Sequence, residues 1–509
     1  MNGVQHVDWA LITPVLAPAV AAVLVLVLDA VLPRAVLAAT GPTALDVVAG
    51  AGLLVGILAT IGLAGDERGT FCTTGDPQGC SYAAEPVTTG LQLVILLAAA
   101  VCLLLAIGQR VQPPRAEHHL LLLAATAGAV AVAGSRDLAT VLVSLETASL
   151  PVVGLVALRR DGRGAEAAIK LLLTSVVSVA LLVLGIAMLY AASGTIYLGP
   201  LGAQGPLAPL APDARALAGL GVVLAVVGIA FKVSVVPFQL WTPDTYAGAP
   251  LPVAAFLAAV SKAAGLAALV VVLAAGAPLL GSTWTQVLAV LAGLTMTVGN
   301  LVALRQTGAV RLLAWSTVAQ AGWVILPLAG AGGSGRQAGP AAGAAIAYLA
   351  AYIVASLLAF AVVAVVSRSA ADGEAHQLTA YVGLARRRPV LGAALAFALV
   401  ALAGLPPGVV GLVAKVLALR PVVAGGFWLL AGVAVVNVAL GIAVYLRWGV
   451  LLLAGVESAD EIADPRPVEV QTGTTRASGP ELAALVTAGV AAVVLSVAPQ
   501  LVAVLTTGL

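Results

Sequence analysis

All four lysines of this sequence lie inside apolar segments, and its polar loops contain none. Lys170, Lys232, Lys262 and Lys415 are the four, whereas the 20 arginines lie in loops or, for Arg311 and Arg447, toward the end of a segment. A charged side chain at mid-bilayer costs about 2.5–3.5 kcal/mol on insertion scales. Arginine stays charged at any relevant pH, but a lysine amine removed from water can become neutral near pH 7. This distribution therefore indicates sites that gain and lose protons.

Glu146 supplies a complementary acid near the middle of another apolar segment, in VLVSLETASLPVV. A carboxylate and an amine that are buried together titrate as one unit, which is the coupling that a gated proton relay requires. For Glu146 and Lys262 the alternative is a structural ion pair. For Lys170, which lies close to a helix end, the alternative is an amine that extends to the membrane surface.

Prolines lie close to two of the lysines. Pro237 comes five residues after Lys232, and Pro406 and Pro407 come nine and eight residues before Lys415. Each proline removes a backbone donor, and such a disruption is tolerated in a membrane only where protein or a wet cavity satisfies the freed groups. The sequence therefore predicts two discontinuous helices that carry ionisable residues, a pattern typical of ion sites in transporters.

The composition requires that these residues be positioned by membrane helices. Of 509 residues, 61% are hydrophobic and 9% are charged, which is too little charge to cover a water-facing surface. The net charge of +2 indicates no nucleic-acid partner. Three cysteines are too few for a disulfide scaffold or an iron–sulfur cluster, and we expect no metal or cofactor in this chain.

Fourteen apolar segments approach the length of about 20 residues that a membrane-spanning helix needs. They are 10–32, 43–64, 87–108, 119–134, 138–158, 165–191, 216–238, 250–276, 284–304, 309–330, 341–367, 389–419, 426–453 and 481–506. The predicted fold class is an all-α polytopic membrane protein. Its discontinuous helices are the seventh and the twelfth.

The loop arginines set the orientation through the positive-inside rule. If both termini lie outside, fifteen arginines lie in inside loops and five in outside loops. The acidic loop 65–86 then lies outside, where Cys72 and Cys80 either form a disulfide or remain two free thiols. The polar stretch 457–479 lies inside and is interpreted as a flexible loop that could contact a neighbouring subunit.

The two helix breaks are five helices apart, and an odd offset reverses direction in the membrane. Helices 4–8 and 9–13 are therefore predicted to be inverted repeats. The predicted division is 1–117 for helices 1–3, 118–280 for the first repeat, 281–455 for the second, and 456–509 for the inside loop with helix 14.

Long stretches of the sequence resemble a known family. FKVSVVPFQLWTPDTYAGAPLPVAAFLAAVSKAAG, GNLVALRQTGAVRLLAWSTVAQAGW, LAGLPPGVVGLVAKVLAL and SLETASLPVVGLVALRRDGRGAEAAIKLLLTSVVS look like motifs of the N-type antiporter-like subunit of proton-pumping NADH–quinone oxidoreductase (respiratory complex I). The match runs from about 118 to 450. The motif AAVSKAAG around Lys262 favours the N-type over its sister subunits, and the M-type sister usually has Glu where Lys415 stands.

The resemblance implies a role for each ionisable residue. Glu146 would pair with Lys232 as the gating couple, Lys262 would be the central proton carrier, Lys415 the outlet, and Lys170 a bridge between them. Together these five residues would form the catalytic relay.

Two positions depart from the family pattern. The family usually has His where Gln239 and Gln320 stand, and an amide cannot exchange its proton near neutral pH. A relay through this chain must therefore pass those points through water. His118 and His119, at a helix end, are predicted to be interfacial.

The resemblance also implies partners and a location. The chain is expected to be a non-redox, proton-translocating subunit of an NADH:quinone oxidoreductase, with NAD, FMN, iron–sulfur clusters and quinone in partner subunits. M-type, K-type, J-type and A-type subunits and the lipid bilayer would be its neighbours, in the plasma membrane of a bacterium, which we expect to be an actinobacterium. The alternatives are an Mrp-type cation/proton antiporter subunit and a structural membrane subunit whose buried charges only set helix register.

Overall fold

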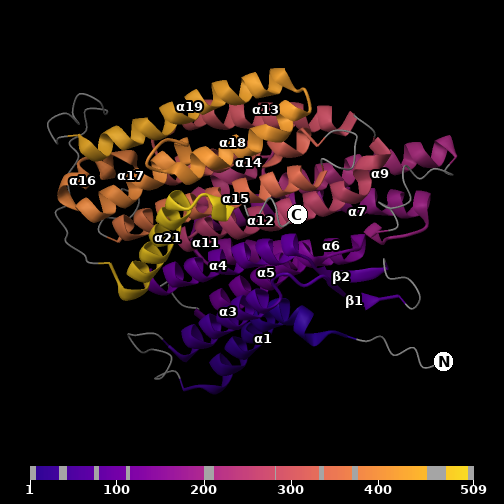
Figure 1. The fold of residues 1–509 in the computed structure, drawn as a ribbon. Coiled ribbons are helices and arrows are strands. Elements are labelled where there is room, and N and C mark those ends of the chain that lie inside the picture. Colours follow the sequence, from indigo (N-terminus) through magenta and orange to yellow (C-terminus); the bar gives the residue numbers. More distant parts are fainter. Residues whose placement is uncertain are drawn as a thin grey trace.

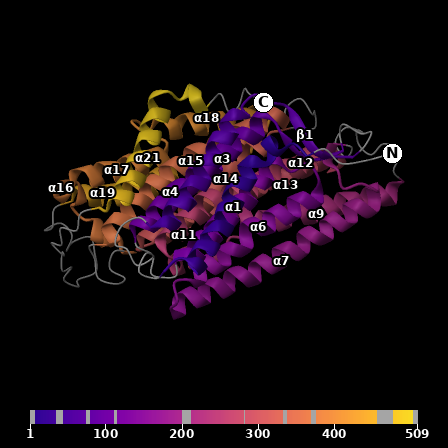
Figure 2. The same cartoon turned by 90° about the horizontal axis from the view of Figure 1, so that it is seen from below.

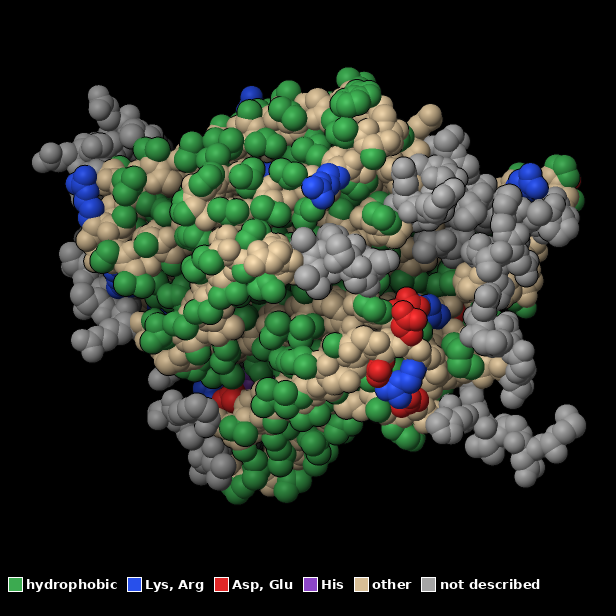
Figure 3. Space-filling model, viewed as in Figure 1, with side chains coloured by type: hydrophobic (Ala, Val, Ile, Leu, Met, Phe, Trp, Pro, Cys, Tyr) green, Lys and Arg blue, Asp and Glu red, His purple; other side chains and the backbone are tan. Residues whose placement is uncertain are grey.

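The computed structural model describes residues 7–33, 43–73, 79–109, 115–199, 211–280, 283–331, 338–368, 376–454 and 477–502. Helices packed side by side make up nearly all of this part of the chain (Figure 1). Hydrophobic side chains cover most of the face seen in Figure 3, with few charged groups among them. A surface of this kind fits contact with lipid, and the chain is an all-α, multi-pass membrane protein.

The long helices correspond to the predicted segments. They are α1 (Trp9–Val31), α3 (Ala44–Gly62), α4 (Pro86–Gly108), α5 (Arg115–Gly134), α6 (Leu138–Ala157), α7 (Gly162–Ser193), α9 (Pro212–Val233), α12 (Lys262–Leu280), α13 (Thr283–Ala303), α14 (Ala309–Ala329), α15 (Ala338–Ser367), α19 (Trp428–Leu453) and α21 (Gly479–Val497). Shorter elements are α10 (Trp241–Gly248), α11 (Leu251–Phe256), a π-helical turn (Leu257–Ser261), a 3-10 turn (Leu378–Tyr381), α16 (Leu384–Arg387), α17 (Pro389–Ala403) and α18 (Val409–Ala424).

Within the described residues, thirteen helices are long and apolar enough to cross a membrane. The remaining predicted segment, 389–419, is divided into α17 and α18, and neither half is long enough to span on its own. The twelfth segment is therefore discontinuous, as the prolines indicated. Of the polar loop 457–479, which was predicted to lie on the inner side, residues 457–476 are not among the described residues.

Both helix breaks have the same local geometry. The first follows α9, where Ser234 has a φ of 68° and the Val236–Pro237 peptide bond is cis. The second follows α17, where Gly404 has a φ of 78° and the Pro406–Pro407 bond is cis. In each break a left-handed residue ends the helix, and a cis proline follows three residues later.

Side-chain caps start several helices at the membrane surface. Asp137 accepts a hydrogen bond from the backbone N–H of Thr140 at the start of α6, and Asp161 accepts one from Gly164 at the start of α7. These caps satisfy backbone donors that the first turn leaves unpaired. They fix where α6 and α7, the helices that carry Glu146 and Lys170, begin. α7 and α9 then pack side by side along one edge of the molecule (Figure 2).

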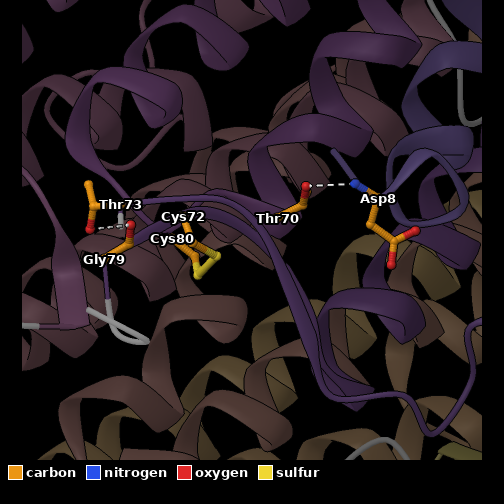
Figure 4. The surroundings of a disulfide bond; sticks show 6 residues. All are labelled: Asp8, Thr70, Cys72, Thr73, Gly79 and Cys80. Atoms are coloured by element: carbon orange, nitrogen blue, oxygen red, sulfur yellow. Dashed lines mark hydrogen bonds between the residues drawn. A yellow bond between two sulfur atoms is a disulfide. The ribbon is translucent and has the colours of Figure 1, made fainter. Parts of the chain in front are cut away.

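A small hairpin, which the sequence did not predict, occupies the polar stretch 65–86. Its antiparallel strands are β1 (Arg68–Cys72) and β2 (Cys80–Ala84), and Cys72 forms a disulfide with Cys80 directly across the pair. Figure 4 shows that the backbone N–H of Asp8 donates to the Thr70 hydroxyl at 3.0 Å, which ties the start of α1 to the hairpin. The disulfide is therefore the alternative that the structure adopts.

The prediction that His118 and His119 lie at the membrane interface is wrong. Both side chains are buried, and His119 Nε2 lies 2.7 Å from Asp46 Oδ1 of α3. A helix end is exposed only if nothing packs over it, and here α3 covers the first turns of α5. The two histidines are thus part of the helix packing of the N-terminal unit.

Candidate functional site

Glu146 and Lys232 come together from α6 and α9. Lys232 Nζ lies 3.3 Å from Glu146 Oε1, within ion-pair distance, although the pair lacks hydrogen-bond alignment. The same amine donates to the hydroxyls of Ser149 at 2.8 Å and Ser175 at 2.7 Å. Two neutral hydroxyls therefore hold the amine in place, and the carboxylate provides a looser electrostatic contact.

A small cavity lies beside this pair. Its volume is about 20 Å³, and its polar lining includes Ser149, Ser175, Lys232 and Ser261. A cavity of this size holds about one water molecule, provided that polar partners surround it. Water at this position would connect the two serine hydroxyls with the Lys232 amine.

Lys262 lies next to this pair but has only neutral partners. Its amine donates to the backbone carbonyl of Lys232 at 3.2 Å and to the Ser234 hydroxyl, and it lies 4.5 Å from the centre of the Trp241 ring. The side chain is 3% exposed, and no carboxylate lies within ion-pair distance of it in the described part of the chain. A permanent charge here would be uncompensated, which is costly in a dry interior.

The break after α9 positions the two oxygen atoms that accept hydrogen bonds from the Lys262 amine, the Lys232 carbonyl and the Ser234 hydroxyl. Ser234 is the left-handed residue that ends α9, and its hydroxyl lies 2.6 Å from that of Thr242 on α10. Lys262 itself follows a π-helical turn, Leu257–Ser261. Such turns leave backbone groups poorly paired and recur at functional sites.

Lys415 lies in a second site, at the break of the twelfth segment. Its amine donates to the carbonyls of Leu402 at 3.3 Å and Ala403 at 2.6 Å, at the end of α17. It also lies 5.4 Å from the centre of the Trp323 ring on α14. Because the helix stops at Gly404, these carbonyls have no helical partner and can accept from the amine.

Gln320, at one of the positions where the family usually has His, lies beside the Lys415 site. Its Nε2 donates to the Tyr445 hydroxyl at 2.8 Å and to the Leu402 carbonyl at 3.4 Å, the same carbonyl that Lys415 uses. Its Oε1 accepts from the Tyr348 hydroxyl. The amide is thus fixed among buried hydroxyls, and a proton passing this point must use those hydroxyls or water.

Lys170 lies in a cluster of charged side chains. Its amine lies 2.8 Å from Asp244 Oδ2 and 2.6 Å from Glu166 Oε1, and the side chain is 44% exposed. Asp244 Oδ1 in turn accepts from Arg311 at 2.9 Å. The structure therefore puts Lys170 in a partly exposed cluster with Glu166, Asp244 and Arg311, and its role as a bridge stays a prediction.

Several site residues were not identified from the sequence. The partners of the amines are mostly serine hydroxyls, backbone carbonyls and tryptophan rings, all of them common in membrane helices. Asp244 lies within the stretch WTPDTYAGAP, and a carboxylate beside a helix break is a signal that could have found it. Among the described residues, no group of three or more His, Cys, Asp or Glu side chains has an arrangement that would hold a metal ion.

Known proteins resemble the chain both in sequence and in fold. Residues 135–441 match the family described as NADH:quinone oxidoreductase/Mrp antiporter, transmembrane. The chain is 41% identical to NADH-quinone oxidoreductase subunit N 2 of Streptomyces griseus, over 98% of this chain and 93% of the relative.

Two solved structures share the architecture. A chain of respiratory complex I from Thermus thermophilus with bound aureothin matches with a TM-score of 0.76 and 32% identity, covering 97% of this chain and 98% of that one. A chain of the Mrp complex from Dietzia sp. has a TM-score of 0.81 at 22% identity, covering 98% and 97%. The second likeness is one of fold alone.

Proposed function

This chain belongs to the subunit N family of NADH-quinone oxidoreductase, and we propose that it moves protons across the membrane through Glu146, Lys232, Lys262 and Lys415. Partner subunits hold NAD, FMN, the iron–sulfur clusters and quinone, and this subunit takes no part in the redox steps. The single observation that carries the proposal is the environment of Lys262. A fully enclosed amine whose contacts are all neutral is arranged to carry charge transiently.

The first step of the proposed relay is separation of the Glu146–Lys232 pair. The contact at 3.3 Å lacks hydrogen-bond alignment, so a modest displacement or a change in nearby charge weakens it. Once the carboxylate withdraws, the Lys232 amine keeps only the neutral hydroxyls of Ser149 and Ser175. Its proton is then held less strongly and can leave.

Lys262 is the acceptor in the second step. Its amine reaches the carbonyl of Lys232 itself, so the two lysines are adjacent across the α9 break. The hydroxyls of Ser234 and Thr242 form a continuous pair beside the amine, and both can donate and accept. Together with the adjoining cavity, they provide the groups through which a proton can pass from one amine to the next.

Lys415 is the outlet in the last step. The carbonyls of Leu402 and Ala403 stabilise its ammonium form, and the ring of Trp323 adds a cation–π contact. Between Lys262 and Lys415 the route passes Gln320 of α14, whose amide, together with the hydroxyls of Tyr348 on α15 and Tyr445 on α19, takes the place of an imidazole.

We also propose the inverted-repeat division into 118–280 and 281–455. The matching breaks at Ser234 and Gly404 support it. The first two helices of each proposed repeat also pack alike. In the pair α5–α6, a Cβ added to Gly128 of α5 would clash with the backbone of α6, and in the pair α13–α14, a Cβ added to Gly299 of α13 would clash with the backbone of α14. The N-terminal unit is then 1–117, and 456–509 completes the chain.

The surroundings of the subunit follow from the same family relation. We propose that it assembles with other complex I subunits, with M-, K-, J- and A-type chains as its membrane neighbours. It would lie in the bacterial plasma membrane with both termini on the outer side, since this orientation puts most loop arginines inside.

A second candidate, an Mrp-type cation/proton antiporter subunit, is supported by one observation, the family description, which covers both NADH:quinone oxidoreductase and Mrp antiporter chains. The two functions differ in the partners with which the chain assembles. Purification of the native complex from membranes separates them, because only the proposed function requires NADH-dependent quinone reduction to co-purify with this chain.

Replacement of Lys262 tests the proposal directly. In inverted membrane vesicles, Lys262→Met should abolish protons pumped per NADH, because the relay loses its central carrier. Lys262→Arg is the matched variant, since it keeps a positive charge but cannot release its proton near neutral pH. Both variants should fail to pump at wild-type amounts of assembled complex. Wild-type pumping by Lys262→Arg would show that a fixed charge suffices and would overturn the relay.

A further inference from the structure

The short helix α10 carries residues that face two different sites. It lies between the break that ends α9 and the extended residue Ala249, which precedes Pro250. At its beginning, the ring of Trp241 lies 4.5 Å from the Lys262 amine, and Thr242 contacts the Ser234 hydroxyl that accepts from that amine. The position of α10 therefore determines two of the groups that surround Lys262.

Contacts with neighbouring elements hold α10 from its first turn, which contains Asp244, to its last residue, Gly248. Asp244 Oδ2 lies 2.8 Å from Lys170 Nζ of α7, and Oδ1 lies 2.9 Å from Arg311 Nη2 of α14. Arg159, just after α6, donates to the carbonyl of Ala247 at 3.0 Å. Gly248 packs so closely on α7 that an added Cβ would lie 2.4 Å from a side-chain carbon of that helix.

The charged side chains around α10 line a surface pocket. The pocket has a volume of about 470 Å³, and its charged lining consists of Arg163, Glu166, Lys170, Asp244 and Arg311. The side chains of the three residues that form the two ion pairs on α10 are between 35% and 54% exposed. These pairs are therefore partly exposed, whereas Lys262, beside the first two residues of α10, is enclosed.

We propose that Asp244 is a positioning residue for Lys262. This inference rests on the proposed function, because it requires that Lys262 be the central proton carrier. It adds that the carboxylate of Asp244 determines how the groups around Lys262 are placed. The two ion pairs of Asp244 hold α10 against α7 and α14, and α10 in turn holds Trp241 and Thr242 at the amine. Lys170 acts here as one of the two cations that hold α10, not as a carrier of the transferred proton.

The exposure of the two ion pairs sets how much proton pumping should fall when one of them is lost. A partly exposed ion pair contributes a factor of about two to five to an equilibrium. Loss of one cation, in Lys170→Gln or Arg311→Gln, should lower proton pumping per assembled complex about two- to fivefold. Asp244→Asn removes both pairs at once and should lower pumping by more than either single variant does, as should the double variant Lys170→Gln/Arg311→Gln; because the pairs share Asp244, the two factors do not simply multiply.

Two further variants separate positioning from general structure. Glu166→Gln is the matched control, because Glu166 pairs with Lys170 within α7 and does not contact Asp244. It should pump as the wild type does. Asp244→Glu keeps the charge and should restore most of the activity that Asp244→Asn loses.

Hydrogen exchange of the complex, followed by mass spectrometry, gives a readout besides activity. Asp244→Asn should speed exchange of the amides of 241–248, whereas Glu166→Gln should leave it unchanged. Unchanged exchange and wild-type pumping per complex in Asp244→Asn would overturn the positioning role, even if less complex assembled. If Lys262→Met pumped normally, the proposed function itself would fail, so the two failures are distinguishable.

Discussion

Glu146→Gln is the substitution that most directly perturbs the start of the relay. The amide has nearly the shape of the carboxylate but no charge, so the packing of α6 against α5 and α7 is retained. Lys232 keeps its bonds to Ser149 and Ser175 and loses only the ion-pair contact at 3.3 Å. The effect of the variant can therefore be assigned to the charge.

The structure sets the size of that effect. Removing one partner of a buried ion pair costs about 3–5 kcal/mol. The Lys232 and Glu146 side chains are 10% and 17% exposed and lack hydrogen-bond alignment, so we use the lower end, about 3 kcal/mol. At about 1.4 kcal/mol for each factor of ten, this cost corresponds to a factor of roughly one hundred.

The assay is NADH-driven proton uptake by inverted vesicles, normalised to the amount of assembled complex. Glu146→Gln should lower the rate at least tenfold. Ser149→Ala is the graded comparison, because losing one hydrogen bond from the charged Lys232 amine costs about 1.5 kcal/mol and should lower the rate less than Glu146→Gln does. A Glu146→Gln complex that pumps at the wild-type rate and stoichiometry would refute the reasoning.

Two further predictions concern the second break and the hairpin. Gly404→Ala should destabilise the protein by about 1–2 kcal/mol, through its left-handed backbone, and should also lower pumping, because a Cβ there would lie 2.9 Å from Lys415 Cδ. Gly426→Ala has the same backbone strain with nothing within 4 Å, so thermal unfolding should show its destabilisation while vesicle assays show normal pumping. The double variant Cys72→Ser/Cys80→Ser should lose about 2–3 kcal/mol of local stability and become sensitive to protease at the hairpin. Its pumping should not change, and a pumping defect would contradict a purely structural disulfide.

The two helix breaks could be predicted from the sequence because their cause is local. Pro237 and the pair Pro406–Pro407 cannot continue a helical hydrogen-bond ladder, wherever the helix packs. The positions of Lys232 and Lys415 on either side of the breaks follow directly. The same reasoning could not show that the seventh segment continues into α10, since an eight-residue helix has no apolar periodicity long enough to detect.

The contacts of the site depend on packing and could not be predicted. Ser149 and Ser175 resemble many other serines in these helices, and only the rotation of α6 and α7 turns them toward Lys232. The resemblance implied a bridging role for Lys170, but its amine pairs with Asp244 at the surface. Similarly, the burial of His119 depends on α3, which lies far away in the sequence.

The measurement that tests the central claim most directly is the charge state of the lysine amines during turnover. The chain has only four lysines, all within its membrane helices, so ¹⁵N-lysine labelling of this subunit gives four amine signals that solid-state NMR can follow in the reconstituted complex. We expect the signal of Lys262 to alternate between the charged and the neutral form when NADH and quinone are supplied. Amines that all stay protonated throughout turnover would contradict proton transfer through this chain.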